Sequence, residues 1–187
     1  MVVTMRDGGR HPLDTPRASA FRAGWRAWRR LVATAVLACV ATVACEDEHW
    51  TSPIAFETGS VWIYSRADSF LLDVDIASEP EQWSLGLSLR PELSPESGMF
   101  FAFSDIQVRS FWMWRTHMAL DVAFVSDNGS ILGIQAMSPC IDERPVSCPR
   151  YPPPAGYLSA LEVNAGWFDH RGIGPGDSVR LVVHGDR

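Results

Sequence analysis

The chain has 187 residues, 47% of them hydrophobic and 20% charged, a balance typical of a globular protein and not of a disordered one. Its formal net charge is −6 at pH 7, and seven of its sixteen arginines fall within residues 1–44, so the rest of the chain is strongly acidic. Because nucleic-acid binding needs a basic surface, this distribution argues against a nucleic-acid partner.

Residues 1–44 are typical of an export leader. The basic segment RAGWRAWRR ends at Arg30 and is followed by fourteen small and apolar residues at 31–44. A membrane-spanning helix needs about 20 apolar residues, so this run is too short to span a bilayer. It matches the apolar region of a secretory signal peptide, and we therefore expect export to a bacterial cell envelope.

Cys45 follows this run directly and resembles the cysteine of a bacterial lipobox. We expect Cys45 to be lipidated, with residues 45–53 as a tether that makes the membrane a partner and residues 54–187 as one folded domain. Cys39, in the stretch VLAC, is the alternative processing site. Cleavage near Ala44 without lipidation would instead give a secreted protein.

The first part of the folded domain predicts strands and a helix. Residues 52–66 are expected to hold one or two strands, and 69–77 alternate in the way a strand does. Ser78 begins a helix signature, with Pro80 in the first turn and Glu81 three residues after the cap. We expect this helix to run through 81–89, with Trp83 and Leu87 on its buried side.

Five more strand regions follow along the chain. Residues 98–105 predict a strand, and 111–126 predict one long strand or two consecutive ones. A turn at 127–129 returns the chain into a strand over 130–137, forming a hairpin. Further strands are expected over 157–166 and 178–185, with a short helical turn between them. The whole predicts a single mainly β domain, a sandwich or a barrel, with one or two short helices.

Cys140 and Cys148 flank part of a proline-rich loop over 139–155. A zinc site would need more ligands and usually a closer spacing. In an oxidising compartment a disulfide is the simpler interpretation. We therefore expect a Cys140–Cys148 bond that holds this loop in place.

Several motifs together resemble the DUF192 family of uncharacterised proteins, over about residues 69–183. The family pattern is roughly G-L-M-x-R, G-M-L-F-x-F, F-W-M-K-N-T-x-x-P-L-D, L-E-x-x-A-G and G-x-x-x-G-D. The matching positions are Gly86, Leu87, Arg90, Gly98, Met99, Phe101, Phe103, Phe111, Trp112, Met113, Thr116, Leu120, Asp121, Leu161, Glu162, Ala165, Gly166, Gly176 and Asp177. The resemblance implies a jelly-roll-like β-sandwich, often exported, and implies no established reaction.

The chain departs from the family pattern at four positions. Trp114 and Arg115 stand where the family usually has Lys and Asn, Ala119 stands for Pro, and Ser88 stands for Met. If the Lys-Asn pair contacts a ligand in the family, this chain has altered that contact.

The stretch SFWMWRTHMALDVAF, at 110–124, carries the strongest candidate site. With strand periodicity, the polar Arg115, His117 and Asp121 point to one face. The other face is apolar and holds Trp112, Trp114, Met118, Leu120, Val122 and Phe124, with Thr116 among them. The polar set forms either a site at a rim or an ordinary solvent-exposed ion pair. If any of the eight tryptophans form an exposed pair, that pair would indicate a glycan or peptide groove.

Arg90 and Glu162 are the other candidates. Arg90 could clamp a carboxylate or phosphate, or it could be an internal partner of Glu162 or Asp121. Alternation places Glu162 in an apolar run, where a buried carboxylate would need a cation or hydrogen-bond donors.

The sequence contains no nucleophile elbow, phosphate loop, dinucleotide fingerprint or metal-ligand spacing, so we expect no cofactor and no metal. The favoured hypothesis is a non-enzymatic module that binds a saccharide or a peptide. Its candidate residues are Arg90, Trp112, Arg115, Thr116, Asp121 and Glu162. The alternatives are a hydrolase using Asp121 and Glu162, for which Asp75 is a further carboxylate, and a structural protein without a ligand site.

Overall fold

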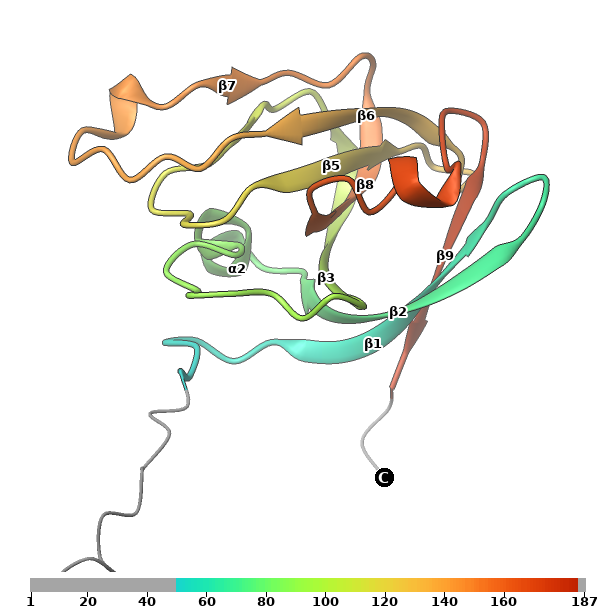
Figure 1. Cartoon of the computed structure of the whole chain (residues 1–187), viewed down its shortest axis with the longest axis horizontal. Helices are drawn as coiled ribbons and strands as arrows, with labels where there is room; N and C mark the ends of the chain where they lie inside the picture. Colours follow the sequence, from blue (N-terminus) through green and yellow to red (C-terminus); the bar gives the residue numbers. More distant parts are fainter. Residues whose placement is uncertain (1–49, 185–187) are drawn as a thin grey trace, which may run out of the picture. The chain divides into compact units, whose positions relative to one another are not determined.

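The computed structural model describes residues 50–184, and Figure 1 shows their arrangement. The predicted leader at 1–44 and both processing candidates, Cys39 and Cys45, lie outside the described residues. Within residues 50–184 no helix is long and apolar enough to cross a membrane. The strands are β1 Glu57–Tyr64, β2 Ser69–Ala77, β3 Ser97–Gln107, β4 Phe111–Trp112, β5 Leu120–Val125, β6 Ile131–Met137, β7 Arg150–Tyr151, β8 Tyr157–Asn164 and β9 Ser178–Val183. The helices are α2 Pro80–Leu85 and two 3-10 turns, η1 Pro145–Ser147 and η2 Asp169–Arg171.

Seven strands form one sheet in the order β6-β5-β8-β3-β2-β1-β9, and β4 pairs with β7 as a separate ribbon. All neighbours are antiparallel except β2 and β3, which are parallel and are connected by the segment that contains α2. The prediction of a mainly β domain with few short helices is confirmed. The sheet is not closed into a barrel. Its edge strands, β6 and β9, are not paired with each other along their length, and an isolated bridge joins Ser130 to Ser178. The jelly-roll arrangement stays a prediction.

Two apolar cores lie on opposite sides of this sheet. On β3, Phe100 belongs to the first core, whereas Met99 and Phe101 belong to the second. Side chains alternate across a strand, so central strands that contribute to both cores are apolar at nearly every position. On β5 all six residues are buried, and this explains why its sequence shows little alternation.

Toward β1 and β9 only one side of the sheet packs against an apolar core. Val61 and Ile63 of β1 pack in the first core. By alternation Ser60, Trp62 and Tyr64 point to the other side, where the second core does not extend. We call this second side of β9, β1 and β2 the outer face.

The helix α2 begins one residue later and ends earlier than predicted. Its N-cap is Glu79, not Ser78, and Glu79 forms a capping box with Gln82. The chain leaves the helix at Gly86, whose φ of 52° is one that glycine adopts readily. Leu87 is buried as predicted, but it lies beyond the helix.

The stretch 110–124 is two strands separated by an irregular segment, not one continuous strand. Arg115 has a φ of 58°, which breaks the alternation between β4 and β5. As a result Met113 and Thr116 are buried, while Trp112 and Trp114 are only half-buried. The predicted assignment of these side chains to two regular faces was therefore wrong.

Cys140 and Cys148 are bonded in the structure, with their Cα atoms 5.8 Å apart. The bond closes the loop that carries η1 and leads into β7. All the strands, both cores and this disulfide lie within the compact unit His49–Arg187. A fragment with these limits contains its complete core, so we expect it to fold by itself.

Candidate functional site

The residues predicted to form one binding edge do not form an open rim of polar side chains. Arg90 lies in the loop after α2 and pairs with Asp75 on β2, at 2.5 Å between Nη2 and Oδ2. Among residues 50–184 Arg90 forms no ion pair with its predicted partners, Glu162 and Asp121. Thr116 and Asp121 are buried, so the predicted edge of Arg90, Arg115, Thr116 and Asp121 is not an exposed polar surface.

Asp121 is a buried brace. Its Oδ2 accepts a hydrogen bond from the backbone N–H of Gly166 at 2.8 Å, which holds the turn after β8 against β5. Burial raises the pKa of the Asp121 carboxyl, and the hydrogen bond from Gly166 opposes that rise. A side chain in this position is structural and is not part of an open cleft.

Glu162 lies within the second core, between Met99 of β3 and Val122 of β5 in the strand register. It is 4% exposed, and among residues 50–184 its carboxyl has no ion-pair partner. Burial alone raises the pKa of Glu162 to about 8, so the carboxyl is mainly protonated at neutral pH. Protonation lets the group remain in an apolar core without a cation.

The register also separates the two carboxylates of the hydrolase hypothesis. Asp121 is paired with Val163, and Glu162 is paired with Val122, the next residue along β5. Since successive side chains of a strand point to opposite faces, Asp121 and Glu162 lie on opposite sides of the sheet. A pair of carboxylates that acts on one bond has to face one space, so the structure does not support this pair.

Trp112 and Arg115 belong to a second surface. The guanidinium of Arg150 lies over the Trp112 ring at 4.0 Å from its centroid, and that of Arg115 lies over Trp114 at 4.5 Å. The two indole rings lie 5.7 Å apart. We call these four side chains the Arg–Trp face. Thr116, predicted as a ligand contact, is buried beneath it.

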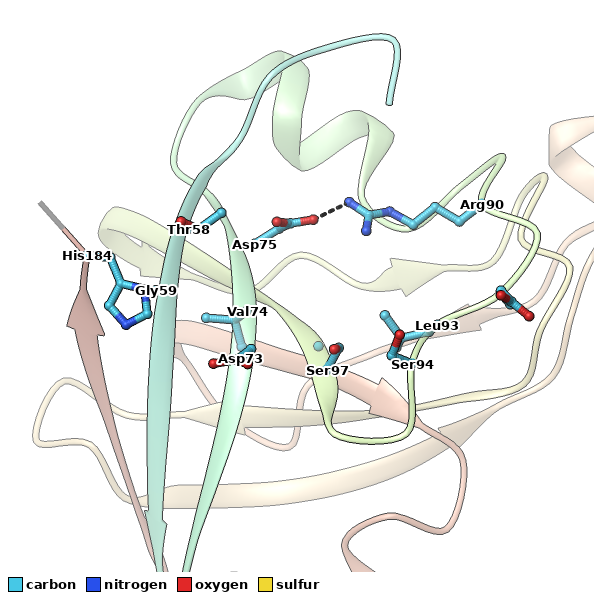
Figure 2. Close-up of a pocket in the computed structure, with 12 residues that line it drawn as sticks. Thr58, Gly59, Asp73, Val74, Asp75, Arg90, Leu93, Ser94, Ser97 and His184 are labelled. Atoms are coloured by element: carbon cyan, nitrogen blue, oxygen red, sulfur yellow. Dashed lines mark hydrogen bonds and ion pairs between the residues drawn. The ribbon is translucent and has the colours of Figure 1, made fainter. Parts of the chain in front are cut away.

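The Arg90–Asp75 pair lies at the edge of a polar pocket of about 380 Å³ (Figure 2). Figure 2 shows the Arg90 guanidinium turned toward the Asp75 carboxylate, with His184 on the other side of β1. β1, β2, the start of β3 and the loop after α2 each contribute to its walls. The polar lining residues are Thr58, Asp73, Asp75, Arg90, Glu92, Ser94, Ser97 and His184.

A short hydrogen-bond chain fixes one side of this pocket. The Ser60 hydroxyl donates to Oδ1 of Asp73 at 3.3 Å and lies 2.9 Å from Nε2 of His184. Here the serine lies between the carboxylate and the histidine. In a catalytic triad the histidine occupies that middle position, so this chain of contacts positions polar groups and does not activate a nucleophile.

Farther along β1, beyond the residues that line the pocket, the outer face carries an aromatic strip. The rings of Trp62 and Tyr64 are 6.2 Å apart and inclined by only 18°, and Tyr64 is 41% exposed. Leu71 of β2, opposite Trp62 in the register, is 47% exposed. The outer face thus joins two nearly parallel aromatic rings to a set of carboxylate, guanidinium and hydroxyl groups.

This strip has a signal in the sequence, although none of its residues was among the predicted site residues. Residues 58–64 alternate strictly, with Thr58, Ser60, Trp62 and Tyr64 on one side and small or aliphatic residues on the other. Period-two alternation places these four side chains together. The pairing of β1 with β2, which adds Asp73 and Asp75, could not be derived from the sequence.

Comparisons with known proteins agree with this fold. Two solved structures are similar over 98% of their own length, each with 25% sequence identity. One is a Sinorhizobium meliloti 1021 protein described as a "putative transcription regulator", with a TM-score of 0.63 over 70% of this chain. The other is a protein of unknown function from Novosphingobium aromaticivorans DSM 12444, with a TM-score of 0.61 over 75% of this chain.

Among curated proteins, none matches this sequence. The model of the DUF192 family, described as "Uncharacterized ACR", matches residues 63–181 and so includes the Arg90–Asp75 pair, Glu162 and the Arg–Trp face. The chain therefore belongs to the DUF192 family.

Proposed function

We propose that this protein is an exported, lipid-anchored binding module of the bacterial cell envelope, and that it holds a saccharide on its outer face. The observation that carries this proposal is the pair of nearly parallel rings, Trp62 and Tyr64, beside the pocket of Arg90, Asp73 and Asp75. The module binds its ligand without a chemical step.

The chemistry of the outer face suits a sugar. Indole and phenol rings offer flat apolar surfaces for the C–H faces of a pyranose, and each also carries a polar group at its rim. Carboxylates accept hydrogen bonds from vicinal hydroxyls, and an arginine donates to ring or hydroxyl oxygens. Asp73, Asp75 and Arg90 provide both kinds of group within one pocket.

The polar groups are also held in position before any ligand arrives. Arg90 is fixed by Asp75, and Asp73 is fixed by the Ser60 hydroxyl. Groups that are already ordered lose less conformational entropy on binding, so they contribute more of their interaction energy to affinity. A saccharide is favoured over a peptide because polar groups dominate the pocket, whereas peptide grooves rely on apolar side-chain pockets or a free strand edge.

Export and lipidation are supported by the leader at 1–44 and by Cys45 after it. The Cys140–Cys148 bond is consistent with an oxidising compartment outside the cytoplasm. Mass spectrometry of the membrane fraction tests this part of the proposal. A diacylated N-terminal peptide starting at Cys45 is expected, and a mature protein that retains residues 1–44 would contradict it.

Binding is tested by screening the His49–Arg187 fragment against envelope oligosaccharides, followed by titration calorimetry on the strongest ligand. Trp62→Ala should weaken binding about 30-fold, the loss expected when an aromatic hot spot worth about 2 kcal/mol is removed. Trp112→Ala, on the Arg–Trp face, is the matched control and should bind like the unmodified fragment. Equal losses in both variants would contradict the proposed location.

A further inference from the structure

The Arg–Trp face is a second surface, separate from the pocket and the outer face. Its order is Arg150, Trp112, Trp114 and Arg115, with each guanidinium stacked on the indole next to it. β4 supplies Trp112, β7 supplies Arg150, and the irregular segment after β4 supplies the other two.

The surroundings hold this face rigidly. The backbone N–H of Arg115 donates to the Cys140 carbonyl at 2.8 Å, and the Arg115 carbonyl accepts from Leu89 at 2.9 Å. The Ser88 hydroxyl donates to the Trp114 carbonyl at 2.9 Å. Cys140 is itself fixed by its bond to Cys148. These contacts keep Arg115 at a φ of 58°, a conformation that non-glycine residues seldom adopt and that persists only where neighbours enforce it.

Both guanidiniums are available for an anion. Within residues 50–184 the ion pairs are Arg90–Asp75, Arg144–Asp142 and Arg171–Glu96, so neither Arg115 nor Arg150 has a carboxylate partner there. Both side chains are exposed. Stacking on a ring leaves the in-plane N–H groups of a guanidinium free, and this fork matches the oxygens of a phosphate.

Aliphatic side chains project beside these cations. Ile141 is 70% exposed and Val146 is 88% exposed, and both lie on the loop closed by the disulfide. The Trp114 Nε1–H donates to the Asp142 carbonyl at 3.2 Å, which ties this loop to the Arg–Trp face. Two exposed aliphatic residues on a braced loop, next to half-buried indoles and unpaired arginines, form an amphipathic surface.

We propose that the Arg–Trp face and the loop 140–148 dock the domain on an anionic phospholipid surface. Arg115 and Arg150 bind lipid phosphates, Trp112 and Trp114 lie at the headgroup level, and Ile141 and Val146 enter the acyl boundary. Tryptophan is enriched at that depth of a bilayer, and each arginine near an anionic surface adds favourable electrostatic energy.

Charge and shape favour a bilayer over a protein partner. Residues 50–184 contain sixteen acidic residues and eight arginines, so most of the domain is repelled by an anionic surface and this face is an exception. Asp142 and Glu143 also lie on the loop, but Asp142 is engaged by Arg144, both by its side chain and by its backbone N–H. Protruding aliphatic side chains need a matching pocket on a protein, whereas a fluid bilayer accommodates them without one.

Vesicle sedimentation of the His49–Arg187 fragment tests this inference without any contribution from a lipid anchor. Vesicles of phosphatidylcholine with about 30% phosphatidylglycerol should bind the fragment, and pure phosphatidylcholine vesicles should bind it far more weakly. The double variant Arg115→Gln/Arg150→Gln should lose affinity about 30-fold, the effect expected for two surface arginines. Val146→Asp should also lose binding, because it places a charge at the apolar boundary.

The matched control is Arg66→Gln/Arg180→Gln, which removes the same charge from exposed positions in the turn after β1 and on β9. This control should bind the anionic vesicles nearly as well as the unmodified fragment. Thermal unfolding of each variant confirms that the fold is intact. Absence of binding to anionic vesicles at low salt, or equal losses in the test and control double variants, would overturn the proposal. Trp62→Ala should leave vesicle binding unchanged, so failure here is distinguishable from failure of the saccharide proposal.

Discussion

Asp121 and Glu162 come from adjacent strands but lie on opposite sides of the sheet, because Asp121 is in register with Val163 and Glu162 with Val122. Asp121 receives a backbone hydrogen bond from Gly166, whereas Glu162 is surrounded by the second core. These two acidic residues of the family motifs therefore have different structural roles. One braces a turn, and the other is a neutral acid in the interior.

The neutral state of Glu162 makes the stability of the domain depend on pH. The folded-state pKa is about 8, compared with the ordinary value of 4.5. Below pH 4.5 the carboxyl is protonated in both states, so its stabilising contribution is complete. Between pH 4.5 and 8 the carboxyl ionises in the unfolded state but stays mainly protonated in the folded state, so the free energy of unfolding falls as the pH rises. The stabilising contribution is lost as the pH passes through 8.

Glu162→Gln should remove this dependence. In denaturant unfolding of the unmodified domain, the free energy of unfolding should be lower at about pH 8 than at about pH 5, by on the order of a few kcal/mol. The variant should show much less change between these two pH values. Glu92→Gln, an exposed acid at the pocket, is the control and should behave like the unmodified domain. Identical pH profiles for Glu162→Gln and the unmodified domain would show that Glu162 is not a buried neutral acid.

The Arg90–Asp75 pair should be strongly coupled. Both side chains are mostly buried, and Arg90 Nε has no hydrogen-bond partner among residues 50–184. Removing one partner leaves the other charge poorly solvated, so Arg90→Met and Asp75→Asn should each lower the free energy of unfolding by about 2–3 kcal/mol. In a double-mutant cycle the double variant should cost less than the sum of the two. Simple additivity would contradict direct pairing.

Gly98 is required for steric reasons. A Cβ at this position would lie 2.6 Å from the Glu162 carbonyl oxygen of β8 and 3.2 Å from Cγ1 of Val163. Because both neighbours belong to a central strand, neither can move away easily. Gly98→Ala should therefore lower the free energy of unfolding by about 2 kcal/mol or more. Gly174→Ala, where a Cβ would meet nothing within 4 Å, should be nearly neutral in the same denaturant titration.

Arg115 should carry backbone strain that a glycine would relieve. Its φ is 58°, and the left-handed region costs an L-residue about 1–2 kcal/mol. Arg115→Gly and Arg115→Ala both remove the stacking on Trp114, so their difference reports the backbone alone. Arg115→Gly should be more stable than Arg115→Ala by about 1 kcal/mol in thermal or denaturant unfolding. Equal stability would show that this segment relaxes to a different conformation.

The regular strands could be predicted from the sequence because alternation and turn residues determine them locally. Residues 69–77 alternate and became β2, and the turn at 127–129 became the hairpin between β5 and β6. The disulfide could also be predicted, since Cys140 and Cys148 are the two cysteines of the predicted folded domain at 54–187. In each case the information lies within a few residues of the feature.

The segment around Arg115 could not be predicted, because arginine gives no signal for a left-handed conformation. The family pattern usually has asparagine at this position, a residue that tolerates positive φ, so the signal lies in the family pattern and not in this chain's own residue. The partner of Arg90 was also missed. That partner, Asp75, lies on β2, and the contact depends on where the loop after α2 runs relative to β2. The whole fold determines that position.

The proposed function depends most on the outer face, where Trp62 and Tyr64 meet the polar pocket. Titration calorimetry of the His49–Arg187 fragment with its best envelope oligosaccharide, repeated with Trp62→Ala and Asp73→Asn, tests this most directly. We predict measurable heats of binding for the unmodified fragment, about 30-fold weaker affinity for Trp62→Ala, and a smaller loss for Asp73→Asn. Absence of binding to any oligosaccharide, or unchanged affinity in both variants, would contradict the proposal.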